Sequence, residues 1–295
     1  MNAEPLLSTE WHWFVILGTL ISLAGVAWVL LANRQTSDKP TTGHVWDGIE
    51  ELDTPLPMWW VGMFVASIVF SLIYLVIYPG MGNFDGVTDW SSAAQHDAEA
   101  QAHEAKFAPL YSSLASLPKE ELQSNRTAMQ VGRRLFINNC STCHGVSASG
   151  SFGYPNLTDS QWLWGGDVAT IKTTLLQGRM GIMPGWGPAL GEAGVMQVTH
   201  YVLQLAGQTH DAELATSGAP QYAAICASCH AADGTGNPLL GAPDLTNNIW
   251  QYGGSVEQIY FTIDNGRTGV MPAFAELLGE DRVHILANYV ETLSK

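Results

Sequence analysis

Two long apolar segments stand out in the hydropathy pattern of the N-terminal third of the chain. Residues 13–32 and 59–78 each form a run of 20 residues without a charged side chain. A helix of this length crosses the roughly 30 Å hydrocarbon core of a bilayer. Tryptophans stand at the start of both runs, as is typical of a membrane interface. The pattern predicts two membrane-spanning helices, at 11–33 and 59–79.

The charges beside these runs predict their orientation. Arg34 and Lys39 lie in the segment 34–58 between the runs, whereas the tail 1–10 has no Lys or Arg. Basic residues favour the cytoplasmic side, so 34–58 is predicted to be a cytoplasmic loop and both chain ends to lie outside, in the periplasm. A cleaved signal peptide is the alternative for the first run. Because acidic and not basic residues precede that run, we expect a retained anchor.

The region after the second run is polar and then becomes repetitive. Residues 80–125 mix Gly, Ser, Ala and charged residues with little periodicity, which predicts a linker. His96 and His103 lie there among carboxylates, and we expect solvated positions for them instead of a metal site.

Residues 126–209 and 210–295 match each other over most of their length, which predicts a duplicated domain. Each unit is interpreted as a helix, a loop-rich middle, a Met-Pro turn and a closing helix, with no strand pattern. Gly132 and Gly218 would let a second helix approach closely, with Tyr201 or Tyr289 as the contact. The matched positions, at offsets of 86 and then 88, include Gly132 with Gly218, Phe136 with Tyr222, Pro155 with Pro243, Trp162 with Trp250, Arg179 with Arg267 and Met183 with Met271.

All four cysteines lie in two identical C-x-x-C-H frames. These are Cys140 and Cys143 before His144, and Cys226 and Cys229 before His230. Such a frame attaches haem c through two thioethers and places the adjacent His to ligate the iron. Zinc or a reactive dithiol could explain one Cys pair, but neither explains a His in the same place twice. We therefore predict two covalently bound haem c groups.

A sixth iron ligand is expected from the repeated Met-Pro pair. A Met thioether raises the reduction potential of a haem into the range of respiratory cytochromes c. Met183 and Met271 are the candidates, because Met180 nearby has Thr268 as its counterpart. The pattern leaves open which Met serves which haem, since a Met of one unit can cross to the iron of the other.

Further side chains have candidate roles around the haems. Arg179, Arg267, Trp162 and Trp250 are candidates for contacts to haem propionates, with simple covering of the haem edge as the alternative. His200 and His284 could offer bis-His ligation, but they do not match each other between the repeats. We expect surface or packing roles for these two histidines.

Composition and charge narrow the function classes. Hydrophobic residues make up 46% and charged residues 13% of the chain, which fits apolar surface facing membrane lipid. The net charge of −15 excludes a nucleic-acid partner, because binding a phosphate backbone needs clustered Lys and Arg. The fold class expected is all-α, with two N-terminal transmembrane helices followed by two tandem domains whose arrangement resembles that of class I cytochrome c domains.

This organisation resembles the di-haem subunit of cbb3-type cytochrome c oxidases, the CcoP/FixP family. The stretch 46–57, followed by Trp59 and Trp60, is similar to the family's signature between its two helices. The resemblance implies a bacterial inner-membrane subunit that takes electrons from a cytochrome c donor. It passes them to the mono-haem c subunit and the catalytic haem-copper subunit, and does no oxygen chemistry itself.

Two other functions are compatible with parts of the pattern. A tethered di-haem shuttle outside any oxidase would use the same anchor and haems. A di-haem peroxidase would need one iron with an open sixth position, against which the two matched Met-Pro pairs argue. The sequence thus predicts an electron relay and no catalytic residue.

Overall fold

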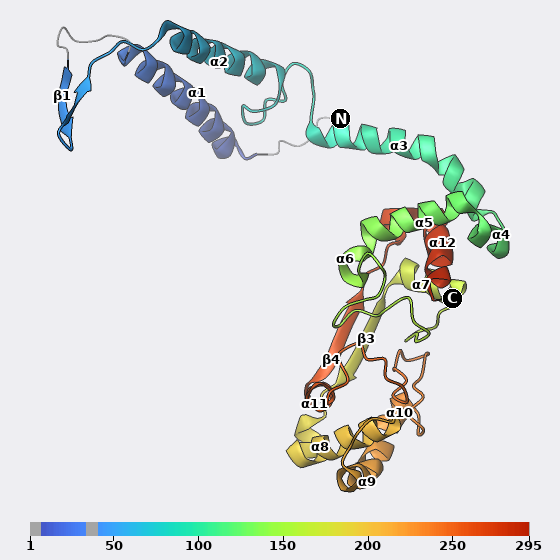
Figure 1. Ribbon diagram of the computed structural model, residues 1–295. Coiled ribbons are helices and arrows are strands. Elements are labelled where there is room, and N and C mark those ends of the chain that lie inside the picture. The colour runs from blue at the N-terminus through green and yellow to red at the C-terminus, as the bar shows by residue number, and fades with distance from the viewer. Residues whose placement is uncertain (1–6, 34–40, 295) are drawn as a thin grey trace. The chain divides into compact units, whose positions relative to one another are not determined.

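The computed structural model of the chain describes residues 7–33 and 41–294, and these divide into two compact units, 1–106 and 107–295. Each unit is described separately below (Figure 1). Residues 34–40, with the predicted charge signal of Arg34 and Lys39, lie outside the described residues, as do 1–6. The chain is mostly helical, as predicted.

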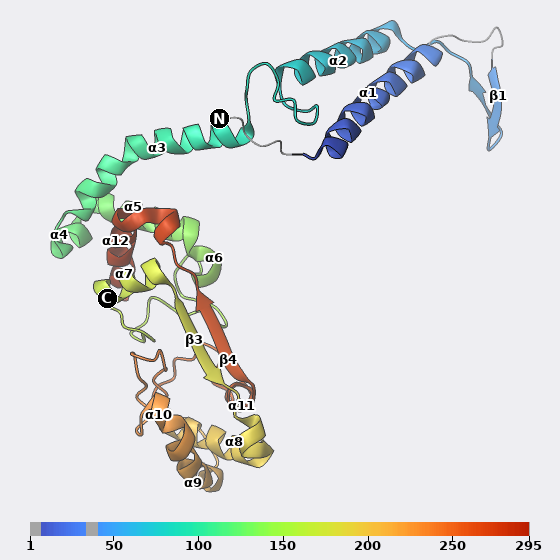
Figure 2. The same cartoon turned by 180° about the vertical axis from the view of Figure 1, so that it is seen from behind.

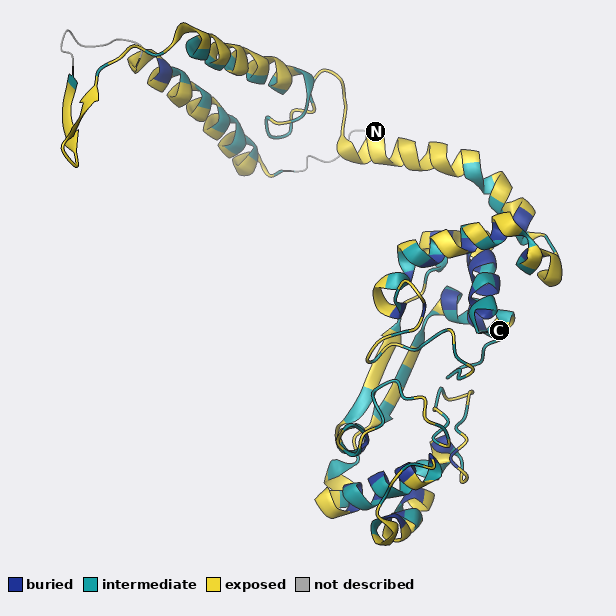
Figure 3. Cartoon of the chain, in the orientation of Figure 1, coloured by how far each residue is buried: buried dark blue, intermediate teal, exposed yellow. Residues whose placement is uncertain are grey.

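The first unit contains two long apolar helices that run antiparallel. Helix α1 (Thr9–Ala32) and helix α2 (Met58–Ile77) are both long and apolar enough to cross a membrane. The start of α1 lies close to the end of α2. Asn83, in the segment that follows α2, donates its backbone N–H to His12 Nδ1 over 2.9 Å, and its side-chain amide bonds with the backbone of Leu7. Leu30 is the one buried residue of these helices among those described (Figure 3), so nearly all their apolar surface is left for lipid or other subunits.

A β-hairpin lies between the two apolar helices. Strand β1 (Thr41–Trp46) pairs antiparallel with β2 (Ile49–Leu52). The turn residues Asp47 and Gly48 have positive φ, as a two-residue type I′ turn requires. The sequence pattern predicted only a loop here.

The second unit consists of two helical lobes and a two-stranded ribbon. The first lobe comprises α4 (Lys119–Ser124), α5 (Arg126–Asn139), α6 (Ser141–His144), α7 (Val168–Gln177) and α12 (Ala275–Leu293). The second lobe comprises α8 (Gly187–Leu205), α9 (Ala212–Gln221), the π-helix η1 (Tyr222–Cys226), α10 (Ala227–His230) and α11 (Val256–Asn265). Helix α3 (Ser92–Ala115) begins in the first unit and ends in the second.

Each lobe combines elements of both sequence repeats. Helix α12, which closes the second repeat, packs on α5 and α7 of the first repeat. Helix α8, which closes the first repeat, packs on α9 and α11 of the second repeat. The repeats are therefore units of sequence, whereas each compact lobe is discontinuous along the chain (Figures 1 and 2).

The ribbon carries the chain between the lobes. Strand β3 (Arg179–Pro184) pairs antiparallel with β4 (Gly266–Met271), in the register Arg179 to Met271 and Met183 to Arg267. The prediction of a Met-Pro turn without strands is wrong at this point. The backbones of the two repeats satisfy each other's hydrogen bonds here, a long-range pairing that no local pattern reveals.

Two apolar cores hold the lobes together. The first contains Phe136, Ile171, Leu175, Val283 and Leu286, and the second contains Val195, Val198, Tyr222, Ile259 and Ile263. Polar caps fix the helix starts around them: Asn125 caps α5, Asp167 caps α7, Asp211 caps α9 and Ser255 caps α11.

Candidate haem sites

Each C-x-x-C-H frame forms the end of a helix and buries its histidine. His144 ends α6 and is 9% exposed, and its Nδ1 lies 3.0 Å from the carbonyl oxygen of Pro155. His230 ends α10 and is 8% exposed, with its Nδ1 3.1 Å from the carbonyl oxygen of Pro243. A carbonyl only accepts, so Nδ1 carries the proton in both rings. The lone pair of Nε2 is then available to a metal.

A tight loop brings each proline back to its histidine. The backbone N–H of Gly150 donates to the carbonyl of His144, and that of Gly236 donates to the carbonyl of His230, both over 2.9 Å. Both glycines have positive φ and face the backbone at the proline, where a Cβ would collide. Pro155 and Pro243 were part of the repeat pattern, but their role as partners of the histidines was not predicted.

Burial shifts the pKa of His230 and of the first cysteine in each C-x-x-C-H frame. Burial lowers the pKa of His230, partly opposed by its hydrogen bond to Pro243, which favours the neutral, metal-binding ring. Burial also raises the pKa of Cys140 and of Cys226 to about 11. The described residues also contain no cluster of three His, Cys, Asp or Glu side chains suited to a metal ion.

The two candidate methionines lie in exchanged lobes. Met271, from the second repeat, packs on the first core, of which Cys140 is a member. Met183, from the first repeat, packs on the second core, against which Cys226 also packs. Met180 is 61% exposed on the other face of strand β3, away from Met183. The residue pattern had left this pairing open.

Contacts of the paired helices follow the same exchange. A Cβ added to Gly132 would lie 2.5 Å from the Cβ of Tyr289, so α5 and α12 touch at this glycine. In the second lobe the rings of Tyr201 and Tyr222 lie 5.1 Å apart. Gly218 meets the backbone at Gln197. Of the two tyrosines expected to contact these helices, Tyr289 therefore contacts α5 in the first lobe, and Tyr201 contacts Tyr222 in the second lobe.

The predicted Arg and Trp residues stay with the haem motif of their own repeat. Trp162 packs on the first core and Trp250 on the second. Arg179 donates from Nε to the Thr174 hydroxyl over 3.0 Å, and its guanidinium lies 4.8 Å from the Trp164 ring centroid. In the same way, Arg267 donates to Thr262 over 3.0 Å and lies 4.4 Å from the Tyr252 centroid. These bonds use only part of each guanidinium's five donors.

The other four histidines considered as ligands make local contacts or are exposed. His200 Nδ1 accepts the backbone N–H of Asp211 over 3.0 Å, at the turn between α8 and α9. His284 lies on α12 beside Asn288, which donates to its carbonyl over 2.9 Å. His96 and His103 are exposed on α3. We retain none of the four as an iron ligand.

Each lobe thus contains one C-x-x-C-H frame with a buried histidine, and the first cysteine of that frame shares an apolar core with a methionine of the other repeat. This donor set fits a covalently attached haem with His and Met on its two faces. The fit holds in both lobes with matching geometry at the histidine.

Comparison with known proteins places both parts of the chain in one family. Residues 38–85 match the model of the N-terminal domain of cytochrome oxidase-cbb3, FixP, and residues 127–202 and 213–290 match that of cbb3-type cytochrome c oxidase subunit III. The chain is 43% identical to the cbb3-type oxidase subunit CcoP of Rubrivivax gelatinosus over 98% of this chain and 96% of that protein. It is 38% identical to CcoP of Cereibacter sphaeroides, over 88% and 96% respectively, and 38% identical to FixP of Azorhizobium caulinodans, over 86% and 92%.

Proposed function

The chain belongs to the CcoP/FixP family, subunit III of cbb3-type cytochrome c oxidases, and we propose that it relays electrons from a cytochrome c donor to the mono-haem c and catalytic haem-copper subunits. It is a membrane-anchored di-haem electron-transfer subunit with two covalently bound haem c groups. The observation that carries the proposal is the duplicated site, in which both histidines donate from Nδ1 to a proline carbonyl.

We propose that each haem takes its two axial ligands from different repeats. Haem attached to Cys140 and Cys143 is ligated by His144 and Met271. Haem attached to Cys226 and Cys229 is ligated by His230 and Met183. The support is the shared core of each pair: Met271 packs with Cys140, and Met183 with Cys226.

Single-haem variants of the full chain test this ligation. Cys226→Ser with Cys229→Ser leaves haem only on the first motif. Ferric haem with a thioether ligand has a characteristic charge-transfer absorption band, so the sulfur donor is read directly. We expect Met271→Leu to remove this band in that background and Met183→Leu to leave it. In the Cys140→Ser, Cys143→Ser background the two methionine variants should exchange their effects.

Bound haem supplies a one-electron couple at its iron, and the chain sets the environment of that couple. Thioether ligation and the apolar cores favour a high reduction potential. We propose that the unused guanidinium donors of Arg179 and Arg267 hydrogen-bond the haem propionates, with Trp162 and Trp250 beside them. Replacing Arg179 with Leu is then expected to lower the midpoint potential of one haem and leave the other unchanged, because a positive charge beside a haem favours its reduced form.

The proposed location is the bacterial inner membrane, with the cytochrome lobes in the periplasm. Antiparallel α1 and α2 bring the start of α1 and the end of α2 together, which supports placing both chain ends on one side. Covalent haem attachment belongs to the compartment in which c-type cytochromes mature. A reporter enzyme that is active only in the periplasm should be active when fused after Lys295, and one that is active only in the cytoplasm should be inactive there.

Purification from the native membrane in mild detergent tests the assignment to an oxidase. Haem b and copper that co-purify with the chain are the expected result. A protein that comes away alone with two haem c groups would favour a tethered shuttle. Rapid binding of cyanide to one resting ferric haem would favour a peroxidase, because it requires an open sixth position.

A further inference from the structure

One loop of the first repeat is joined directly to the second lobe. The backbone N–H of Gly153 donates to the carbonyl of Gln251 over 2.8 Å, and Gln251 Nε2 donates back to the Gly153 carbonyl over 2.7 Å. Beside this pair the rings of Phe152 and Tyr252 meet edge to face, with centroids 5.8 Å apart. Two reciprocal hydrogen bonds and a ring contact fix both distance and orientation.

Each side of this junction is linked to a proposed iron ligand through a short series of contacts. On one side, the loop closes through reciprocal backbone bonds between Ser151 and Tyr154 and continues to Pro155, which accepts the hydrogen bond of His144. The junction is therefore rigidly connected to the histidine side of the first haem site.

On the other side, the junction reaches the methionine side of the second haem site. Tyr252 stacks on the guanidinium of Arg267, 4.4 Å from the ring centroid. Arg267 stands opposite Met183 in the ribbon. Trp250, next to Gln251 in sequence, packs on the second core.

The matching place between the repeats is built differently. At the offset of 88, Phe152 corresponds to Leu240, Gly153 to Gly241 and Tyr252 to Trp164. Gly241 packs against the Trp164 ring as Gly153 does against the Tyr252 ring, but Leu163 stands at the position of Gln251 and has no side-chain donor. A hollow opens beside this ring, lined by Trp164, Thr170, Thr173, Arg179, Pro238 and Leu239. Among the residues that the structure describes, the pair of reciprocal hydrogen bonds is thus found on one side of the pseudo-symmetric pair.

We propose that Phe152 and Gln251 are positioning residues that fix the spacing of the two haems for electron transfer between them. This proposal rests on the proposed function, in which each lobe holds one haem. The step is the transfer of one electron: ferrous iron in one lobe becomes ferric as ferric iron in the other becomes ferrous, with no bond or proton changed. Electron transfer slows steeply with distance, so a junction that sets the spacing also sets the rate.

Phe152→Ala and Gln251→Leu, made singly in the full chain and purified in detergent apart from the other haem-containing subunits, test the proposal. Phe152 is 64% exposed, so its removal leaves both cores intact. Leu240→Ala is the matched control, because it changes the corresponding position of the other repeat. Pulsed electron paramagnetic resonance of the oxidised protein gives the distance between the irons. Flash injection of one electron gives the rate of exchange between the haems.

We expect each test variant to lengthen or broaden the distance distribution and to slow exchange, with both thioether absorption bands retained. The control should keep the distance and rate of the unmodified chain. Unchanged distance and rate in both test variants would overturn the proposal and leave the electron-relay function standing. Fewer than two covalent haems in the unmodified chain would overturn the relay function, and this proposal with it.

Discussion

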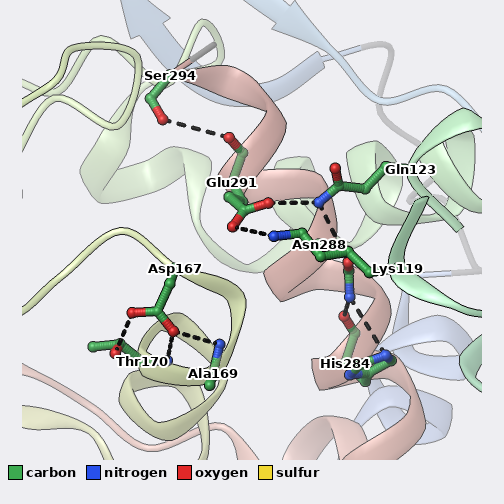
Figure 4. Close-up of polar contacts among 9 residues, drawn as sticks. All are labelled: Lys119, Gln123, Asp167, Ala169, Thr170, His284, Asn288, Glu291 and Ser294. Atoms are coloured by element: carbon green, nitrogen blue, oxygen red, sulfur yellow. Dashed lines mark hydrogen bonds and ion pairs between the residues drawn. The ribbon is translucent and has the colours of Figure 1, made fainter.

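A buried carboxylate ties the segment before the repeats to the first lobe. Glu291 of α12 is 7% exposed and accepts hydrogen bonds from Lys119 Nζ over 2.8 Å and Gln123 Nε2 over 2.7 Å (Figure 4). Both donors lie on α4. A buried charge is tolerated only when it is paired and hydrogen-bonded, so α4 and α12 depend on each other.

Lys119→Met is expected to lower the thermal unfolding midpoint of the first lobe. The substitution keeps the apolar stem and removes the charge, so the buried Glu291 loses its ion pair with Lys119. Lys172→Met is the control, because the partner of Lys172, Glu280 at 3.7 Å, is 79% exposed. An exposed pair of this kind contributes about 0 to 1 kcal/mol. Equal unfolding midpoints of the two variants would contradict the prediction.

The cap of α7 makes the same lobe sensitive to acid. Hydrogen bonds from the Thr170 hydroxyl and from the Thr170 and Ala169 backbone lower the pKa of Asp167 below its usual value of 3.8. A group with a lowered folded-state pKa stabilises the fold above its unfolded pKa. That stabilisation is lost as the pH falls through the folded-state pKa.

Asp167→Ala should therefore destabilise the protein by about 1 kcal/mol at pH 7, as for loss of an N-cap. The difference from the unmodified chain should begin to shrink as the pH falls below about 4, where Asp167 of the unfolded chain becomes protonated, and should be lost as the pH falls through the lower folded-state pKa. Denaturant unfolding at a series of pH values measures this. A difference that stays constant down to low pH would show that the charged cap is not the cause.

At the scale of elements, strands β3 and β4 each carry the methionine of one repeat to the lobe that contains the C-x-x-C-H frame of the other repeat. This ribbon depends on two glycines. Gly178, directly before β3, has a φ of +73°, and Gly266, the first residue of β4, has a φ of +76°. A Cβ at Gly178 would lie 2.6 Å from the carbonyl oxygen of Met271, and one at Gly266 would meet the carbonyl of Met183. Each glycine thus sits against the backbone of a proposed ligand.

Gly178→Ala should destabilise the ribbon and weaken the thioether band of the first haem. Gly279→Ala is the matched control: Gly279 also has φ of +73°, but an added Cβ would have nothing within 4 Å. The control carries only the conformational cost, about 1 to 2 kcal/mol. The difference between the variants isolates the close approach to Met271. If both variants keep the band at full strength, the crossing strand does not hold the ligand.

At the scale of the whole molecule, the second unit includes more than the two sequence repeats. Leu114 of α3 and Leu122 of α4 belong to a buried cluster with Ala128 and Ile285. The compact unit accordingly begins at Phe107, within the predicted linker 80–125. This segment therefore contributes to the stability of the first lobe.

Two truncations test that contribution. A chain that begins at Ser92 loses both apolar helices and should be soluble, with both haems attached and no association with the other oxidase subunits. A chain that begins at Arg126 also loses Leu114, Leu122 and Lys119, so it should unfold at lower denaturant concentration. Equal stability of the two soluble chains would contradict the role of α3 and α4. Oxidase association of the Ser92 chain would mean that the lobes make the main docking contact.

Local patterns in the sequence by themselves determined the apolar helices and the haem-attachment motifs of this protein. Uninterrupted apolar runs specify helices that can span a membrane, because length and apolarity suffice for that. The adjacent Cys and His residues specify haem attachment, because the five positions lie in one helical turn and its cap. The repeat offsets favoured Met183 and Met271 over Met180 as the predicted iron ligands.

The tertiary structure decided how those parts combine. The two repeats have matching apolar faces, so their pattern alone does not show whether helix α12 packs on α5 or on α9. In the structure α12 packs on α5 and α7, and the long-range pairing of β3 with β4 accompanies this exchange. The Gly153–Gln251 junction and the Lys119–Glu291 pair join residues about a hundred or more positions apart. Contacts of that kind depend on the packing of the complete chain, which is why local periodicity and spacing predicted the sites but not their partners.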